Sequence, residues 1–265
     1  MKFTKMQGLG NDYVYLDCTR ETPEDLPALA RRVSDRHFGI GSDGLICICP
    51  SDCADVRMRM YNADGSESEM CGNGIRCVGK FAYDKGLVGK TSLTVETLAG
   101  IKHLELHLEH GKVSAVTVDM GVPTWEENRV LTIQGEDYTV TPVSMGNPHA
   151  VLYVDDPGAV DLPRLGPDFE HHPSFPNRTN TEFVQVLGPD HLRMRVWERG
   201  SGETMACGTG ACAVLVATVL NGKCGRSADV DLLGGRLHIR WDEETGHVFM
   251  TGGAATVFEG ELIEE

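Results

Sequence analysis

An internal repeat is the feature that most limits what this chain can fold into. Residues 57–74 read RMRMYNADGSESEMCGNG, and residues 193–210 read RMRVWERGSGETMACGTG. The offset of 136 residues is constant along both segments, and it places Cys207 on Cys71. Each copy ends in Cys-Gly-x-Gly and continues into a helix-like run. A period of this length predicts two similar units, each large enough to bury its own core.

The repeat also extends to polar positions outside these segments. The matched pairs are Asn11 with Asn147, Asn62 with Glu198, and Gly44 with Asn180. A duplication that had kept only its core would match best at apolar positions. Here the polar and glycine positions match best, so we interpret the repeat as a duplicated functional site.

The overall composition is that of an ordinary globular protein, with 41% hydrophobic and 24% charged residues among 265. The formal net charge of −15 argues against nucleic acid or an acidic membrane as partner. No stretch approaches the roughly 20 apolar residues of a membrane helix. The opening, MKFTKMQGLGNDYVYLD, lacks a signal-peptide pattern, and nine cysteines then indicate thiols in a reducing, cytoplasmic setting.

Alternating apolar residues between Gly, Asn and Asp turns predict many short strands along both halves. Two longer helices are expected at about 73–85 and 208–221, and the stretches 24–36 and 160–170 are expected to be peripheral helices or turns. The run GACAVLVATVLNG in the second of the longer helices is apolar nearly all round, which is typical of a helix buried on every side.

We therefore expect each half to wrap a strongly curved sheet around one central helix. The expected domains are 1–122, which carries Cys71, and 123–265, which carries Cys207. The link should lie near 121–129, where a proline and polar residues interrupt the strands. The final run GGAATVFEGELIEE can add a strand to either half.

Cys-Gly-x-Gly at a helix start is a candidate chemical site. The first N–H groups of a helix lack internal partners, and the helix dipole is positive there. A thiolate at that point is stabilised, which predicts a pKa below the roughly 8.5 of a free thiol. The glycines let a carboxylate approach the backbone closely.

Two such thiols on opposite faces of a substrate carbon can invert it, because one removes a proton and the other supplies one. Racemases and epimerases that work in both directions need such a pair of bases. This chemistry demands no cofactor, and the sequence has no phosphate-binding loop. GIGSDG at 39–44 has only part of a dinucleotide-binding turn.

The motifs together resemble the diaminopimelate epimerase family over essentially the whole length. They are KMQGLGNDYVYLD, RHFGIGSDGL, RMYNADGSESEMCGNGIRC, MGNPHAV, NRTNTEFVQV and WERGSGETMACGTGACA. The resemblance implies cofactor-independent conversion of LL-diaminopimelate to meso-diaminopimelate, for lysine and peptidoglycan precursors. It further implies an α+β fold of two pseudo-symmetric halves, each a barrel-like mixed β-sheet wrapped around a central helix. The substrate and assembly that it implies are a small-molecule amino acid and a homodimer.

The resemblance also implies roles for single residues. Cys71 and Cys207 are the two acid/base residues, and His149 and Glu198 tune the thiols. The substrate-binding residues that it implies are Asn11, Asn62, Asn147, Asn180, Glu198 and Arg199, with an N–H cradle at Gly72, Asn73, Gly208 and Thr209. One position departs from the family: many members carry Gln where this chain has Gly44, which puts a side-chain contact there in doubt.

Other functions stay open at this point. The chain could be a racemase of another amino acid, such as proline or hydroxyproline. It could instead be a non-catalytic ligand-binding protein, or a redox protein with a Cys71–Cys207 disulfide. No metal site is expected, because Cys47, Cys49 and Cys53 alternate like a strand and lack partners at zinc-like spacing.

Overall fold

The chain folds into two units that are defined by their internal contacts. The structure is a computed structural model, and it describes residues 1–263, so that the last two residues of the C-terminal run, 264–265, lie outside the described part. Unit 1 comprises Met1–Val118 and the segment from Gly252 onward, and unit 2 comprises Asp119–Thr251. The domain boundaries of 1–122 and 123–265 stay a prediction.

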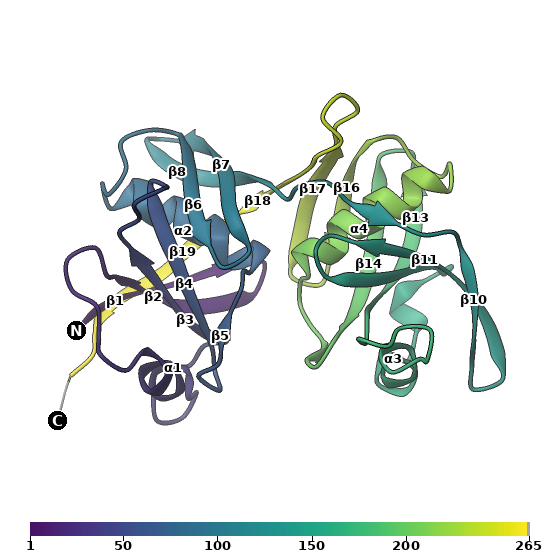
Figure 1. Ribbon diagram of the computed structural model, residues 1–265, viewed down its shortest axis with the longest axis horizontal. Helices are drawn as coiled ribbons and strands as arrows, with labels where there is room; N and C mark the ends of the chain where they lie inside the picture. Colours follow the sequence, from purple (N-terminus) through teal and green to yellow (C-terminus); the bar gives the residue numbers. More distant parts are fainter. Residues whose placement is uncertain (264–265) are drawn as a thin grey trace. The chain divides into compact units, whose positions relative to one another are not determined.

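Unit 1 is a mixed sheet around one helix, α2 (Figure 1). Its strands are β1 (Lys2–Gly8), β2 (Asn11–Asp17), β3 (Gly44–Cys49), β4 (Val56–Asn62), β5 (Glu67–Ser68), β6 (Ser92–Thr97), β7 (Gly100–Glu109), β8 (Lys112–Asp119) and β19 (Ala255–Glu261). Its helices are α1 (Leu26–Ser34) and α2 (Gly72–Asp84). The strand order is β19-β1-β2-β3-β4-β6-β7-β8, with parallel pairs at β2–β3 and β4–β6.

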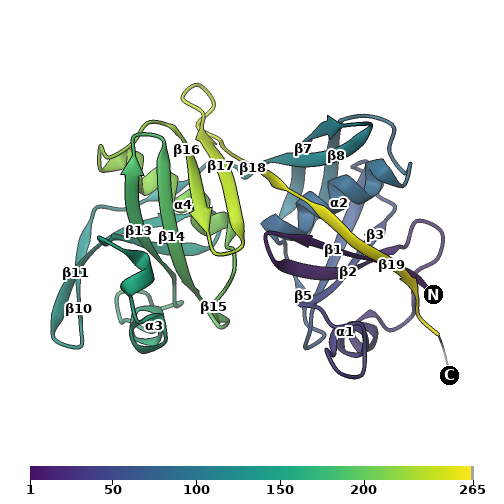
Figure 2. The ribbon, with the colours of Figure 1, turned by 180° about the vertical axis from the view of Figure 1, so that it is seen from behind.

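Unit 2 repeats this arrangement around α4, which Figure 2 shows from behind. Its strands are β9 (Thr124–Trp125), β10 (Arg129–Ile133), β11 (Glu136–Ser144), β12 (Pro148–Tyr153), β13 (Asn180–Gly188), β14 (His191–Glu198), β15 (Gly202–Glu203), β16 (Ser227–Leu232), β17 (Gly235–Trp241) and β18 (Val248–Gly253). Its helices are α3 (Leu162–Glu170), α4 (Gly208–Leu220) and the short 3₁₀ turn η1 (Pro157–Ala159). The order β11-β12-β13-β14-β16-β17-β18 has parallel pairs at β12–β13 and β14–β16.

Residues that match across the 136-residue repeat also pair with each other in the same way in the two sheets. Tyr13 lies opposite Gly44 in the parallel pair β2–β3. His149 lies opposite Asn180 in the parallel pair β12–β13. Each of these residues of unit 2 follows its counterpart in unit 1 by 136 positions. The expected α+β fold of two similar halves is confirmed.

The central helices are buried because their faces are apolar or small. In α4 the stretch Ala211–Thr218 has almost no exposure, as its apolar composition predicts. The helix contacts β11, β12, β13, β16 and β17, and α2 correspondingly contacts β1, β2, β3, β4 and β7. The helices expected at 73–85 and 208–221 are α2 and α4, and the stretches expected as peripheral helices or turns contain α1 and α3. No helix end differs from the expected one by more than two residues. The expected link at 121–129 contains the two-residue strand β9, which pairs with β11.

Each unit has an ion pair at the same position of its repeat. Arg59 Nε lies 2.9 Å from Glu67 Oε1, and Arg195 Nε lies 2.7 Å from Glu203 Oε1. Each pair ties the long strand to the two-residue strand, β5 or β15, that leads to the cysteine. The loops before α2 and α4 are therefore held in the same way.

Candidate active site

Both repeated cysteines are the N-caps of the central helices. Cys71 has an extended backbone (φ −130°, ψ 122°), and its sulfur accepts a hydrogen bond from Gly74 N at 3.3 Å. Cys207 has the same conformation (φ −113°, ψ 110°) and accepts from Gly210 N at 3.4 Å. Each sulfur thus takes the place of the oxygen that usually caps a helix. Cys71 is half-buried, whereas Cys207 is buried.

The GLGND motif places Asn11 beside Cys71. Leu9 and Gly10 form a two-residue turn with positive φ (57° and 84°), so that β1 and β2 make a hairpin in which Gly8 pairs with Asn11. The Cys71 thiol donates to Asn11 Oδ1 at 3.2 Å. The hairpin thus brings Asn11 into contact with Cys71, and the role of Asn11 in substrate binding stays a prediction.

The first turn of α2 is held from inside unit 1. Gly72 and Asn73 are its first two residues, and both are buried. Arg76, which is fully buried, donates to Gly72 O at 3.1 Å and to Asn73 Oδ1 at 3.0 Å. The Asn73 side-chain oxygen is thus held by Arg76, and the backbone N–H cradle at Gly72 and Asn73 stays a prediction.

Asn62 ends β4 in the register row that contains Tyr13 and Gly44. Gly44 pairs with Tyr13 on one side and with Asn62 on the other. A Cβ atom at Gly44 would lie only 2.1 Å from Tyr61 O, so this backbone has no room for a side chain there. Asn62 Nδ2 donates to Ser66 Oγ at 3.0 Å within the following turn. The backbone at position 44 therefore has room for glycine but not for the Gln side chain that many family members carry there.

Around Cys207 the polar residues form a connected chain. His149 Nδ1 lies 2.6 Å from Glu182 Oε1, and His149 Nε2 lies 3.1 Å from Asn147 Oδ1. Asn147 Nδ2 donates to Thr209 Oγ1 at 3.2 Å, and that hydroxyl lies 3.6 Å from Cys207 Sγ. The structure therefore brings four of the predicted site residues of unit 2 together with Glu182.

Glu198 is the second acidic group at Cys207. Its carboxylate accepts from the Thr204 hydroxyl and interacts with the Cys207 thiol. Burial raises the pKa of Glu198 above its ordinary value. Burial, together with the carboxylates of Glu198 and Glu182, raises the pKa of Cys207 well above that of a free thiol.

The prediction that the helix N-terminus lowers the pKa of both thiols is thus wrong for Cys207. The physical reason is that the helix dipole contributes only part of the local field. Burial removes the water that would solvate a thiolate, and two nearby carboxylates repel it. The N–H of Gly210 and the hydroxyl of Thr209 act in the opposite direction but do not outweigh them.

Asn180 and Arg199 are joined by a hydrogen bond. Asn180 is buried, its Oδ1 accepts from Arg199 N at 2.9 Å, and its Nδ2 donates to Pro148 O at 2.8 Å. The Arg199 guanidinium is exposed and donates to Asn177 O at 3.2 Å. The Asn180 side chain fixes the turn after β14, and the roles of both residues in substrate binding stay a prediction.

Three residues of these clusters were not found from the sequence: Glu182, Asp43 and Tyr13, the last of which interacts with Cys71. Glu182 matches Ile46 across the repeat, so the offset gave no signal for it. Asp43, which contacts Asn11, matches Thr179 and was equally hidden. Tyr13 could have been found, because it matches His149.

The described residues show neither a metal-binding group nor a membrane-spanning helix. Within residues 1–263 no group of three or more His, Cys, Asp or Glu side chains is arranged to hold a metal ion. Among the helices of the described chain, none has the length and apolar character needed to cross a membrane.

The chain is similar in sequence to diaminopimelate epimerases from several organisms. The family model described as diaminopimelate epimerase matches residues 3–126 and 141–257. The diaminopimelate epimerase of Desulfovibrio desulfuricans is 57% identical, over 98% of each chain. That of Acetivibrio thermocellus is 56% identical over 99% of this chain and 98% of its own, and that of Methanococcus maripaludis is 54% identical over 99% of each.

Solved structures with low sequence identity share the fold. A phenazine biosynthesis protein of the PhzF family from Bacillus anthracis superposes with a TM-score of 0.77 at 19% identity, over 100% of this chain and 99% of its own. A probable proline racemase from Agrobacterium radiobacter gives 0.74 at 16% identity, over 100% and 93%. These two confirm the two-part α+β fold, and the relatives in sequence decide the family. The chain belongs to the diaminopimelate epimerase family, the isomerases of lysine biosynthesis.

Proposed function

We propose that Cys71 and Cys207 are the acid/base pair with which this chain epimerises LL-diaminopimelate to meso-diaminopimelate. One thiolate removes the proton from the α-carbon, and the electron pair of the C–H bond stays on that carbon. The opposite thiol then delivers a proton to the other face. The two sulfurs end with exchanged protonation states, and nothing is oxidised or reduced. The mechanism requires both thiols to reach one α-carbon from opposite sides.

The observation that supports this proposal is the shared position of the two thiols as helix N-caps. Each sulfur accepts from the third N–H of its helix, Gly74 or Gly210. The earlier N–H groups of a helix have no acceptor within it, and they carry the positive end of the dipole. They are suited to hold the substrate carboxylate, where negative charge grows as the α-proton leaves. Gly72, Asn73, Gly208 and Thr209 supply those N–H groups in the proposal.

His149 and Glu198 serve as auxiliary groups in this proposal. Both lie within the polar cluster of Cys207, and Glu198 interacts with its thiol directly. A buried thiol whose pKa is raised needs a nearby proton acceptor before it can act as a base. Asn11, Asn62, Asn147, Asn180 and Arg199 are proposed to bind the polar groups of the substrate.

The test is proton exchange at the α-carbon. Reduced protein is incubated with LL-diaminopimelate in heavy water, and deuterium and stereochemistry are followed by mass spectrometry and chiral chromatography. Cys71→Ser and Cys207→Ser should both lose epimerisation, because a hydroxyl is a far weaker acid than a thiol. Cys53→Ser, at an exposed cysteine outside both clusters, is the matched control and should keep full activity.

Retained epimerisation in either active-site variant would show that the thiol pair is not the acid/base machinery. Activity on proline instead of diaminopimelate would point to another substrate. The homodimer and the cytoplasmic location also stay proposals. Light scattering on the purified protein measures the first, and fractionation of the source cells measures the second.

A further inference from the structure

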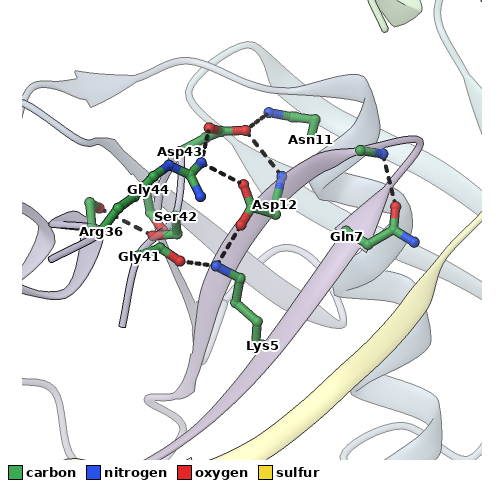
Figure 3. Close-up of polar contacts among 11 residues, drawn as sticks. Lys5, Gln7, Asn11, Asp12, Arg36, Gly41, Ser42, Asp43 and Gly44 are labelled. Carbon is green, nitrogen blue, oxygen red and sulfur yellow. Dashed lines mark hydrogen bonds and ion pairs between the residues drawn. The ribbon is translucent and has the colours of Figure 1, made fainter. Parts of the chain in front are cut away.

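A network of charged side chains lies next to Asn11 in unit 1 (Figure 3). Lys5, which is buried, lies 2.5 Å from Asp12 Oδ2 and also donates to Gly41 O. Arg36 bridges two carboxylates, with its Nη2 at 3.1 Å from Asp12 Oδ1 and 3.0 Å from Asp43 Oδ1. The network thus joins the hairpin that carries Asn11 to the loop that carries Asp43.

Asp43 is the member of this network that touches the candidate site. Its Oδ2 accepts from Asn11 Nδ2 at 2.8 Å and from Asp12 N at 3.1 Å (Figure 3). A carboxylate can only accept hydrogen bonds, so the NH₂ group of Asn11 must face Asp43. The orientation of the Asn11 amide is therefore decided by the chemistry of its partner.

The other end of the amide faces the reactive sulfur. Asn11 Oδ1 lies 3.2 Å from Cys71 Sγ. An amide oxygen can only accept, so the sulfur must be the donor in this contact and carry its proton. A hydrogen bond made by the neutral form of an acid favours that form over the ionised one. The Asn11 amide thus stabilises Cys71 as a thiol.

The matching asparagine of unit 2 has the opposite polarity. Asn147 turns its NH₂ group toward Thr209, beside Cys207, and its oxygen toward His149 Nε2, an arrangement in which Nε2 carries a proton and donates it. The position that matches Asp43 is Thr179, whose hydroxyl donates to Asn180 O. Position 179 of unit 2, which matches Asp43 of unit 1, thus carries a hydroxyl instead of a carboxylate. The two repeated amides present an acceptor at one cysteine and a donor at the other.

We propose that Asp43 is a positioning residue of the epimerase: by fixing the Asn11 amide, it holds Cys71 as the thiol that donates a proton. The proposal rests on the proposed catalytic role of Cys71. It makes the two thiols inequivalent before substrate binds, with Cys71 prepared as the acid.

Other titratable groups of unit 1 also interact with Cys71. They are Tyr13, Tyr15 and Cys77, and burial raises the pKa of each of them, to about 11 for Cys77. All three are therefore neutral near pH 7. The Tyr13 hydroxyl also interacts with the Asn11 side chain. The hydrogen bond that Cys71 donates to Asn11 is a contact through which the charge of Asp43 can act on the thiol.

The experiment measures the titration of Cys71 in the full-length protein. The rate of alkylation by iodoacetamide is followed against pH, with the modified peptide quantified by mass spectrometry. Asp43→Asn lets residue 43 donate to Asn11, so that the amide can turn its NH₂ group toward the sulfur. We expect the midpoint to fall by about one pH unit, which is a tenfold rise in thiolate at fixed pH.

A double-mutant cycle separates this route from a direct charge effect. In the Asn11→Ala background, Asp43→Asn should cause no further shift, because the amide that transmits the effect is gone. Equal shifts in both backgrounds would mean that the Asp43 charge acts on Cys71 directly, and an unchanged midpoint in Asp43→Asn would mean that it does not act at all. Either result overturns the proposal.

Two further variants control for general disturbance. Asp12→Asn removes a carboxylate that holds the same Arg36 but leaves the Asn11–Asp43 contact, so the Cys71 midpoint should stay in place. Asp43→Thr copies the residue that unit 2 carries and should shift the midpoint as Asp43→Asn does, which keeps the test valid if one variant fails to fold. A shift in Asp12→Asn as large as in Asp43→Asn would also overturn the proposal.

The titration is independent of turnover, so the two proposals can fail separately. If Cys71→Ser keeps epimerase activity, the proposed function is wrong whatever the titration shows. If Cys71→Ser is inactive and the midpoint does not respond to Asp43, only the role of Asp43 is wrong.

Discussion

Glu182 Oε1 lies 2.6 Å from His149 Nδ1, and neither side chain is exposed to solvent. The two residues come from the adjacent parallel strands β13 and β12, where Glu182 pairs with Val151 and lies diagonally across from His149. Its other oxygen, Oε2, is buried and has no hydrogen-bond partner among the described residues. A carboxylate on Nδ1 requires a proton on that nitrogen, which leaves Nε2 to exchange protons on the side of Asn147.

The first prediction is that Glu182→Gln lowers kcat while the fold is kept. Glutamine has the same shape and can still accept from Nδ1–H, but it no longer supplies the negative charge that stabilises a protonated imidazole. We expect a loss of about 10- to 100-fold, by analogy with the loss when a carboxylate that orients a metal-bound histidine is replaced. Steady-state kinetics across pH 6–9 measure it, with circular dichroism as the check on folding.

Glu170→Gln is the matched control for that variant. Glu170 is a buried carboxylate of the same unit, but it binds Trp197 Nε1, Arg178 and Gly200 N. The Glu170→Gln variant should be less stable than the unmodified protein but should keep its kcat. Equal kcat values in Glu182→Gln and in the unmodified protein would rule out a role for Glu182 in catalysis.

The sequence could predict those site residues that are local in the chain or matched across the 136-residue repeat. It could not predict contacts between residues that the repeat does not match. The positions of Cys71 and Cys207 at two helix starts could be predicted, because the N-cap and the following glycines are local in the chain. Glu182 could not, because its match is the apolar Ile46 and its contact with His149 joins residues 33 positions apart. The raised pKa of Cys207 was missed for the same reason. The local helix dipole was visible in the sequence, whereas the carboxylates of Glu182 and Glu198 come from other strands.

The second prediction concerns the sign of the effect of Glu198 on Cys207. Burial raises the pKa of Cys207, and the charge of Glu198 raises it further. Glu198→Gln removes that charge and should lower the pKa, although burial keeps it above the ordinary value. Alkylation of Cys207 at fixed pH should then become faster, by about tenfold for each unit of pKa. Epimerase activity should fall at the same time, because the proposed proton acceptor is lost.

Mass spectrometry of the Cys207 peptide after timed alkylation is the measurement. Glu203→Gln is a suitable control, since Glu203 pairs with Arg195 and is not among the groups that act on Cys207. Slower alkylation in Glu198→Gln would mean that Glu198 activates the thiol rather than repelling its charge.

The third prediction is that Gly210→Ala destabilises unit 2 and reduces kcat, although alanine is the better helix former by about 1 kcal/mol. A Cβ atom there would lie 2.7 Å from Glu182 Oε1 and 3.2 Å from Cys207 Sγ. Glu182 cannot move aside without breaking its contact with His149. We expect a net cost of about 1–3 kcal/mol, as for other overpacked sites.

Urea unfolding and steady-state kinetics measure both effects. Gly89→Ala is the control, because a Cβ atom at Gly89 meets nothing within 4 Å. Unchanged kcat and stability in Gly210→Ala would mean that the backbone at the start of α4 shifts easily, and that the position of the thiol is not tightly held.

The last prediction concerns stability at low pH. Glu170 lies at the end of α3. Burial acts to raise its pKa, but the hydrogen bonds from Trp197 and Gly200 and the electrostatic interactions with His171 and Arg178 lower it overall. A carboxyl whose pKa is lower in the folded than in the unfolded chain stabilises the fold above the unfolded value, about 4.3 for Glu. That stability is lost as the pH falls through the folded pKa.

The free energy of unfolding should therefore separate Glu170→Gln from the unmodified protein at pH 6–7. The difference should shrink as the pH falls below about 4, because the unmodified Glu170 then becomes protonated and resembles the amide. Urea unfolding monitored by tryptophan fluorescence at several pH values measures this, with Trp197 beside the substituted group. A difference that stays constant down to the lowest pH at which the protein folds would show that the Glu170 charge contributes nothing, and that only its shape matters to the end of α3.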